Sequence, residues 1–527
     1  MAFVSFGFLL FTAATALVYF LAPERSRWVV LLSASLLFLF LNSGWLTLIV
    51  IGTSAVTWLF GLWLHDNDRK TKETAAALTG EARRAARETG KKRGKRILSL
   101  GIILVLGTLL LLKYYDFFAR GANGLLGRAG FALPRFRFLL PLGISFYTLQ
   151  AIAYMTDIQR GKLAPDRDPA KFLLFMTYFP QIVQGPIPRH HQLAGQLYAG
   201  HTFDARRVSM GAQLILWGFM KKLILADRVS VPVVWLFSHY AETRGLCTFL
   251  AGVLYGVQVY ADFSGGMDIA RGVSQIFGIE LEQNFRQPYF ARSVEEFWRR
   301  WHITLGAWMR DYVFYPLSLS RGLTALGKKA RERLGPQVGK RVPAFISMFV
   351  VYFLVGFWHG AEWKYIGYGV WNGLIIMTSL LLPEVYARAR GKLHIRQESR
   401  LWRGFQMLRT FILCSLGRYF SRAESLGAAL AMFRLTALRW YDLTFLFDGT
   451  LTGAGLNAAN WAAALVMAGL VFWVDCLHER DVHIREGIAA RGGVFRWCVY
   501  CAAVMAVIVF GMYGPGYDAG SFIYEQF

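Results

Sequence analysis

The sequence predicts an all-α polytopic membrane protein, built as a single domain over residues 1–527. Its 527 residues are 55% apolar and only 17% charged, whereas a typical soluble domain is about a quarter charged. Apolar stretches of roughly 20 residues recur along the chain, and each is long enough to cross a hydrocarbon core of about 30 Å. The formal net charge of +25 lies in short blocks between them. Because a nucleic-acid-binding domain would gather such charge on one soluble surface, we expect the lipid bilayer, and no nucleic acid, as a partner.

The first apolar stretch predicts a retained helix, because it has no basic residues before it and no clear small-residue cleavage site. The second predicts a tight hairpin that breaks near Asn42, Ser43 and Gly44. Runs of about 10 to 14 apolar residues are too short to cross and predict re-entrant or protein-buried helices. We expect about eleven spans and a few partial ones from the stretches at 3–22, 28–64, 97–118, 138–154, 172–183, 209–226, 246–262, 345–358, 365–382, 404–416, 461–476 and 494–511.

The basic blocks predict the orientation of the chain. Lysine and arginine gather in residues 65–97, 321–341 and 388–409, whereas residues 445–460 contain neither. Short cytoplasmic loops are enriched in these residues, so the three basic blocks are expected in the cytoplasm and 445–460 on the opposite side. Residues 71–89, rich in Ala, Glu and Arg, predict a helix on the membrane surface.

Several familiar chemistries are not supported. The five cysteines are scattered through apolar text and are expected to be buried small hydrophobes rather than disulfides. Two histidines near residue 480 are spaced as HExxxH instead of HExxH, so on a helix they diverge and predict a solvated segment without a metal. The chain has no Walker A loop, dinucleotide fingerprint or GxSxG elbow. The residues of the rejected metal motif are Asp475, His478, Glu479 and His483.

Two histidines lie in polar stretches next to apolar segments and are candidates for catalytic residues. Residues 278–316 interleave tryptophan with charged side chains around His302, which suits either an interfacial helix or a buried functional histidine. His359 follows an apolar span and precedes Gly360, so substrate could approach it closely. A neutral imidazole accepts a proton readily near neutral pH, which makes His359 the best candidate for a general base; the alternative is a residue that caps the helix end.

Other interruptions predict irregular backbone next to membrane segments. The prolines and glycine of residues 179–191 cannot continue a helix, and His190 and His191 at its end are expected to face solvent. Residues 141–147 and 260–266 are either helix breaks that line a cavity or simple turns. They contain Ser145 and Ser264, conceivable nucleophiles without a visible partner base nearby in the sequence.

At five places the residues resemble the membrane-bound O-acyltransferases. The matching stretches are PLGISFYTLQAIAYMTD (141–157), FPQIVQGPIPR (179–189), YADFSGGMDIARG (260–272), NFRQPYFARSVEEFWRRWHITLGAWMRDYVFYPL (284–317) and GFWHGAEWKYIGYGVWNG (356–373). They place the core motifs in residues 141–373. Within the family the chain is similar to bacterial members that acetylate alginate or transfer D-alanine to teichoic acids. It departs from many alginate-type members after the RDY motif, where it has no glycine-glycine-asparagine segment.

The resemblance implies a ring of helices around a central tunnel, with His359 and His302 as the catalytic histidines. It implies transfer of an acyl group, most simply acetyl from acetyl-CoA or another thioester, toward a polysaccharide outside the cytoplasm. The resemblance implies no bound cofactor or metal. It does imply a periplasmic SGNH-type partner protein and a location in the bacterial inner membrane. The candidate tunnel residues are Trp298, Trp301, Arg310, Asp311, Trp358, Asn372, Ser145 and Ser264. D-alanyl transfer from a carrier protein, or a transporter without covalent chemistry, are the alternatives.

Overall fold

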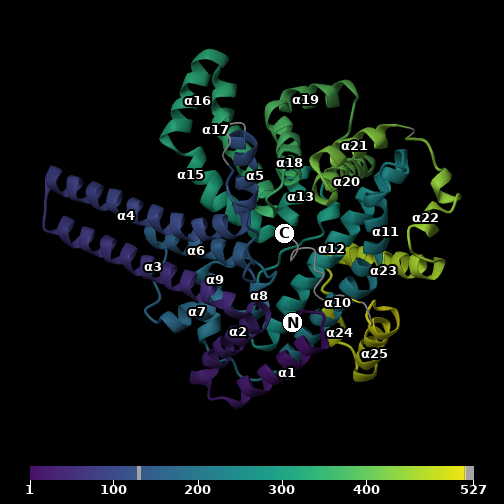
Figure 1. Ribbon diagram of the computed structural model, residues 1–527, viewed down its shortest axis with the longest axis horizontal. Helices are drawn as coiled ribbons and strands as arrows, with labels where there is room; N and C mark the ends of the chain where they lie inside the picture. Colours follow the sequence, from purple (N-terminus) through teal and green to yellow (C-terminus); the bar gives the residue numbers. More distant parts are fainter. Residues whose placement is uncertain (128–131, 439, 515–516, 518–527) are drawn as a thin grey trace. The chain divides into compact units, whose positions relative to one another are not determined.

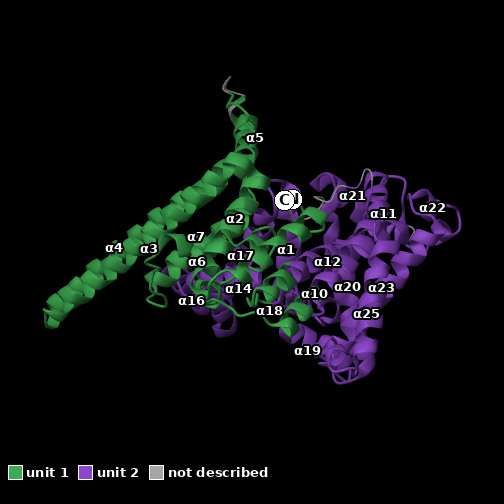
Figure 2. Ribbon diagram, turned by 90° about the horizontal axis from the view of Figure 1, so that it is seen from below, with its two compact units in different colours: residues 1–212, 270–282 green, residues 213–269, 283–527 purple. Residues whose placement is uncertain are grey.

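A computed structural model describes residues 1–127, 132–438, 440–514 and 517. The described residues form helices and no β-sheet, which confirms the all-α prediction. They divide into two compact units: residues 1–212 with 270–282, and residues 213–269 with 283–527 (Figure 2). Helix α12, Gly245–Ile276, contributes residues to both units. Seven described helices are long and apolar enough to cross a membrane, or eight if the bent pair α18 and α19 is one span. The count of about eleven stays a prediction.

Unit 1 contains the N-terminal helices. The predicted hairpin breaks where expected, since α2 ends at Ser43, Gly44 takes a positive φ of 52° and α3 begins at Thr47. The apolar stretch at 172–183 becomes two short, mostly buried helices, as its length predicted. The stretch at 138–154 begins with exposed residues outside any helix and enters a buried helix only at Ile144. The helices are α1 (Phe6–Leu21), α2 (Arg27–Ser43), α3 (Thr47–Ala76), α4 (Gly80–Leu109), α5 (Tyr115–Leu126), α6 (Ile144–Gln159), α7 (Pro169–Thr177), α8 (Phe179–Ile182), α9 (His190–Tyr198) and the first half of α10 (Ala205–Phe219).

The single helix predicted for residues 71–89 is wrong, whereas its place on the membrane surface stays a prediction. Helices α3 and α4 instead run side by side as one long antiparallel hairpin that turns at residues 77–79 (Figure 1). The reason is a close helix contact: a side chain on Gly90 would clash with Thr71, and Asn67 donates a hydrogen bond to the Gly90 carbonyl (3.1 Å). Pairing thus continues through the basic segment, and residues 65–97 are mostly two helix ends rather than a loop.

The two histidines at 190 and 191 differ in the structure of unit 1. His191 is exposed as predicted, but His190 is buried, and its Nε2 lies 2.6 Å from Asp166. The Tyr198 hydroxyl also donates to Asp166 (2.7 Å). Burial raises the pKa of Asp166, but the hydrogen bonds from His190 and Tyr198 and nearby charge outweigh this and hold the pKa below its ordinary value. The carboxylate therefore explains why His190 turns inward.

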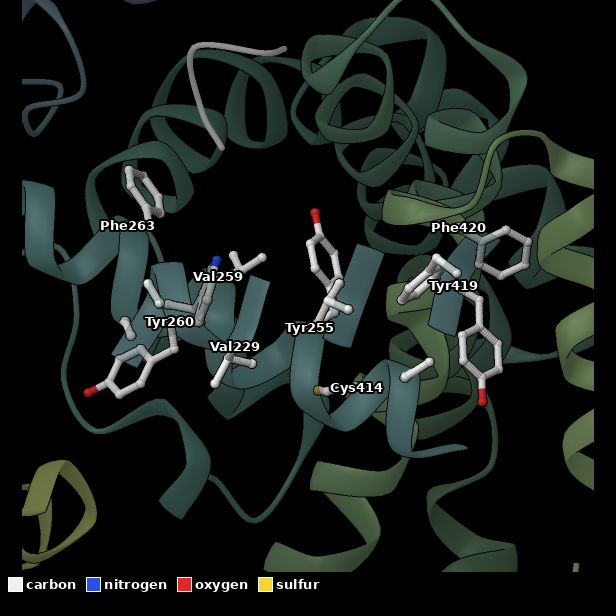
Figure 3. Close-up of a cluster of buried hydrophobic side chains, with 14 of the residues drawn as sticks. Val229, Tyr255, Val259, Tyr260, Phe263, Cys414, Tyr419 and Phe420 are labelled. Atoms are coloured by element: carbon white, nitrogen blue, oxygen red, sulfur yellow. The ribbon is translucent and has the colours of Figure 1, made fainter. Parts of the chain in front are cut away.

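Unit 2 carries both candidate catalytic histidines. Its core is a continuous cluster of apolar side chains from α11, α12, α13, α20, α21 and α23, part of which Figure 3 shows. Cys247 and Cys414 are buried as predicted, whereas Cys498 and Cys501 are exposed on α25, which presents no buried residue. The elements are η5 (Met220–Ala226), α11 (Asp227–Ser238), α13 (Val294–Arg300), α14 (Ile303–Met309), η7 (Arg310–Phe314), α15 (Tyr315–Ser318), α16 (Arg321–Leu334), α17 (Pro336–His359), α18 (Trp363–Leu381), α19 (Pro383–Lys392), α20 (Arg400–Arg422), α21 (Leu426–Ala437), α22 (Thr450–Gly453), α23 (Ala458–His478), α24 (Ile484–Ala489) and α25 (Gly493–Phe510).

Candidate active site

His302 lies at a break between two short helices. Helix α13 ends at Arg300, α14 begins at Ile303, and His302 between them takes the left-handed conformation with φ 48° and ψ 53°. A non-glycine residue rarely adopts this region, so the surrounding structure must hold it there. Asn284 does so: its side-chain oxygen accepts hydrogen bonds from the Thr304 backbone N–H (2.9 Å) and hydroxyl (2.8 Å), and its carbonyl accepts from the Ile303 N–H (3.0 Å).

The side chain of His302 is buried among aromatic rings. Its exposed fraction is 2%, and its ring meets those of Phe263 at 5.0 Å and Trp358 at 5.9 Å between centroids, both edge-on. Burial, with a smaller contribution from the charge that His359 would carry, lowers the pKa of His302 well below its ordinary value. His302 is therefore a neutral imidazole with one N–H to donate.

His359 is the last residue of α17 and is only partly buried. Its ring meets Trp358 at 5.2 Å and Tyr368 of α18 at 5.8 Å. Helices α17 and α18 pack backbone to backbone here, because a side chain on Gly356 would clash with the Tyr365 carbonyl. Gly356, three residues before His359, thus lets α17 approach α18 closely and holds His359 against that helix.

Trp298, Asn372 and their neighbours join α13 to α18. The Trp298 indole donates a hydrogen bond to the Asn372 side-chain oxygen (3.2 Å), and the Asn372 amide donates to the Tyr368 carbonyl (2.9 Å). Trp301, 3% exposed, stacks on Phe297 at 5.4 Å. Of the predicted tunnel residues, Trp358 contacts the rings of both histidines. Trp298 and Asn372 contact Tyr368, whose ring meets His359, while Trp301 packs on Phe297.

The other predicted site residues have polar partners of their own. The Arg310 side chain is 57% exposed and pairs with Asp311 (3.1 Å), so it has an exposed ion pair instead of a buried place beside the histidines. Ser145 belongs to unit 1, where its hydroxyl accepts from Lys113 (3.1 Å). Ser264 accepts from Lys221 (2.8 Å), whose ammonium also binds Asp268 (2.7 Å). Because Lys221 is an ammonium group paired with Asp268, it cannot remove a proton from Ser264.

The rejected metal motif takes part in ordinary polar contacts. Asp475 accepts a hydrogen bond from the Tyr260 hydroxyl (2.8 Å), and Glu479 pairs with Arg300 (2.7 Å). Over the described residues, no group of three His, Cys, Asp or Glu side chains could hold a metal ion. These partners explain why acidic side chains occur near the end of α23.

Sequence reasoning missed Asn284 and Arg418. Nothing in the residues around Asn284 marks it as the support of His302, because the two are linked only by the fold. Arg418 is 4% exposed in α20, with its guanidinium carbon 4.7 Å from the centre of the Trp301 ring. A charged residue two positions after the apolar stretch 404–416 was the available signal.

Comparison with known proteins gives the family. Residues 159–328 match the family described as MBOAT, membrane-bound O-acyltransferase family. The probable alginate O-acetylase of Azotobacter vinelandii is 30% identical over 461 residues, which are 87% of this chain and 80% of the relative. The peptidoglycan O-acetyltransferase of Helicobacter pylori is 30% identical over 364 residues, 64% of each chain. The teichoic acid D-alanyltransferase of Streptococcus thermophilus is 30% identical over 239 residues, 44% of this chain and 55% of the relative.

The fold and these relatives define a helical enzyme that spans the membrane several times. The chain belongs to the membrane-bound O-acyltransferase family and is an O-acyltransferase. The family resemblance and the enzyme class predicted from the motifs are both confirmed.

Proposed function

We propose that this enzyme transfers an acyl group, most simply acetyl, from a cytoplasmic thioester toward the hydroxyls of a polysaccharide outside the cytoplasm. The relatives named for alginate and peptidoglycan O-acetylation support a polysaccharide acceptor. The basic blocks at 65–97, 321–341 and 388–409 support an anionic donor on the cytoplasmic side, such as acetyl-CoA. The membrane is then the bacterial inner membrane.

The observation that carries the proposal is the unequal pair of histidines. His302 is fully buried, whereas His359, close enough to influence its charge, is partly accessible at a helix end. In this proposal His359 is the general base, because a substrate hydroxyl can reach it and a neutral imidazole accepts the proton. His302, kept neutral by burial, donates its N–H to the oxyanion that forms in the transition state.

The reaction then proceeds by direct transfer. His359 takes the proton of the acceptor hydroxyl as its oxygen bonds to the thioester carbonyl carbon. The tetrahedral intermediate collapses and the C–S bond breaks. The protonated His359 then gives its proton to the leaving thiolate, which departs as a thiol. Direct transfer is the simpler scheme, because Ser264 accepts its hydrogen bond from an ammonium group paired with Asp268 and not from a base. Trp298 and Asn372 are positioning residues that hold α13 against α18.

A partner protein completes the proposed function. A site enclosed in a membrane protein cannot by itself follow a long polymer, so an extracytoplasmic SGNH-type enzyme is expected to hand the acyl group on. A gene for such an enzyme beside the gene for this chain would support polysaccharide acetylation.

The test uses purified protein in detergent with radiolabelled acetyl-CoA. We expect the wild type to release or transfer acetyl, and His359→Ala and His302→Ala to lose at least 100-fold in rate. His191→Ala, an exposed histidine of unit 1, is the matched control and should keep full activity. Full activity of a folded His359→Ala protein would overturn the assigned base.

D-alanyl transfer is the second candidate, because a teichoic acid D-alanyltransferase is among the relatives. Its donor would be a D-alanyl thioester on a small acidic carrier protein. If neither the wild type nor any variant releases or transfers acetyl from acetyl-CoA, the same proteins are assayed with that carrier thioester. Turnover that depends on His359 would then favour D-alanyl transfer over acetylation.

A further inference from the structure

Arg418 places a positive charge in the interior of unit 2. It lies in the last turns of α20 and is 4% exposed. The groups close enough to interact with its charge are Tyr255, Tyr289, Tyr368 and Cys414, in addition to the Trp301 ring. Figure 3 shows two of them, Tyr255 from α12 and Cys414 from α20, within the same buried cluster.

Among the described residues, no carboxylate balances this charge. Within the described part of the chain, Arg418 forms no ion pair, and its Nη2 atom is buried without a hydrogen-bond partner. Two other buried cations of unit 2 are compensated by carboxylates, since Lys221 binds Asp268 at 2.7 Å and Lys222 binds Asp262 at 2.6 Å. The buried Arg228 forms no ion pair within the described residues either, but its guanidinium donates a hydrogen bond to the Phe510 carbonyl (2.9 Å). A buried charge without a partner is costly, and the cation–π attraction to Trp301 is weaker than the hydration that the guanidinium gives up.

The position of Arg418 connects it with both catalytic candidates. Trp301, on which the guanidinium lies, directly precedes His302 in the chain. Tyr368, which faces Arg418 electrostatically, also presents its ring to His359. The cation therefore lies against the residue that precedes His302 and within electrostatic reach of a tyrosine that contacts His359, on a helix that belongs to neither catalytic motif.

We propose that Arg418 binds an oxyanion of a substrate, a carboxylate or a phosphate, while the acyl group is transferred at the histidines. A guanidinium offers several N–H donors in a plane and matches both anions. The inference rests on the proposed function, which supplies two sources for such an anion. A phosphate would come from the thioester donor, whereas a carboxylate would come from a sugar acid of the acceptor.

This proposal predicts an unusual pattern of stability and binding. Without substrate, Arg418 contributes an uncompensated buried charge, so Arg418→Met should melt at the same temperature as the wild type or higher. The same substitution should weaken binding of the anionic substrate at least tenfold. A structural role for the cation–π contact predicts the reverse, a lower melting temperature and unchanged binding.

The experiment measures melting temperature and equilibrium binding of the full-length protein in detergent. The probes are coenzyme A, with phosphate-free pantetheine as its control, and a glucuronate oligosaccharide, with a neutral oligosaccharide as its control. Arg434→Met is the matched variant, since Arg434 is exposed in the last turn of the neighbouring helix α21 and lies outside the basic blocks. If Arg418→Met weakens binding of coenzyme A alone, the bound anion is a phosphate of the donor. If it weakens binding of the glucuronate oligosaccharide alone, the bound anion is a carboxylate of the acceptor.

Three results would overturn the proposal. They are wild-type protein that binds neither probe, Arg418→Met protein that binds both within twofold of the wild type, and Arg418→Met protein that melts well below the wild type. His359→Ala separates this test from that of the proposed function, because it should bind the probes normally and fail only in transfer. Normal transfer by His359→Ala would refute the assigned base and leave the binding result intact.

Discussion

Replacement of Asn284 by alanine should disturb the candidate active site without touching a histidine. Asn284 is 1% exposed, and its side-chain oxygen accepts two hydrogen bonds from Thr304. The substitution removes both bonds, each worth about 1 kcal/mol net, and leaves a buried N–H and hydroxyl without their acceptor. We expect the free energy of unfolding to fall by about 2 to 4 kcal/mol. Because the left-handed backbone at His302 loses its support, kcat should fall at least tenfold.

The assay combines denaturant unfolding in detergent with acyl transfer kinetics. Gln283→Ala is the control, since Gln283 is an adjacent, exposed amide that bonds only to the Phe285 carbonyl among described residues (2.6 Å). A double-mutant cycle with Thr304→Val isolates the hydroxyl contact, for which we expect a coupling energy of about 1 kcal/mol. If Asn284→Ala leaves both stability and kcat at wild-type values, the argument that Asn284 holds His302 is refuted.

Three further predictions concern other contacts. Gly356→Ala should overpack the α17–α18 contact and cost about 1 to 3 kcal/mol of stability, with a loss of activity at the nearby histidine; a melting temperature equal to that of the wild type would contradict it. Lys222→Met should cost about 3 to 5 kcal/mol by leaving buried carboxylates unpaired, and Lys222→Met with Asp262→Asn should recover part of it in thermal unfolding. Because the folded pKa of Asp166 is lowered, its contact with His190 stabilises the protein above the ordinary pKa of about 4 and is lost as pH falls through the folded value. Asp166→Asn should therefore melt lower at pH 7 and respond less to acid below pH 4, which a pH series of melting temperatures checks.

Part of the site could be predicted from the sequence because its residues stand in local motifs. His302 and His359 are conspicuous because they are polar residues within or next to apolar stretches. Within a few residues of them, or within the next span, lie Trp298, Trp301, Trp358 and Asn372. Arg310 shares the same motif, yet the structure gives it an exposed ion pair. Proximity along the chain does not decide which way a side chain points from a helix.

The sequence by itself determined the class of this protein, because hydropathy and motif order are properties of the chain alone. It determined the helical membrane fold, the break at Gly44 and the short buried helices, since each depends on local length and composition. Only the tertiary structure decided that Asn284 supports His302, that Asp166 draws His190 inward and that Arg418 lies beside Trp301. In each case the partners are separated by 18 to 117 residues, and a contact across such a distance is set by how the helices pack.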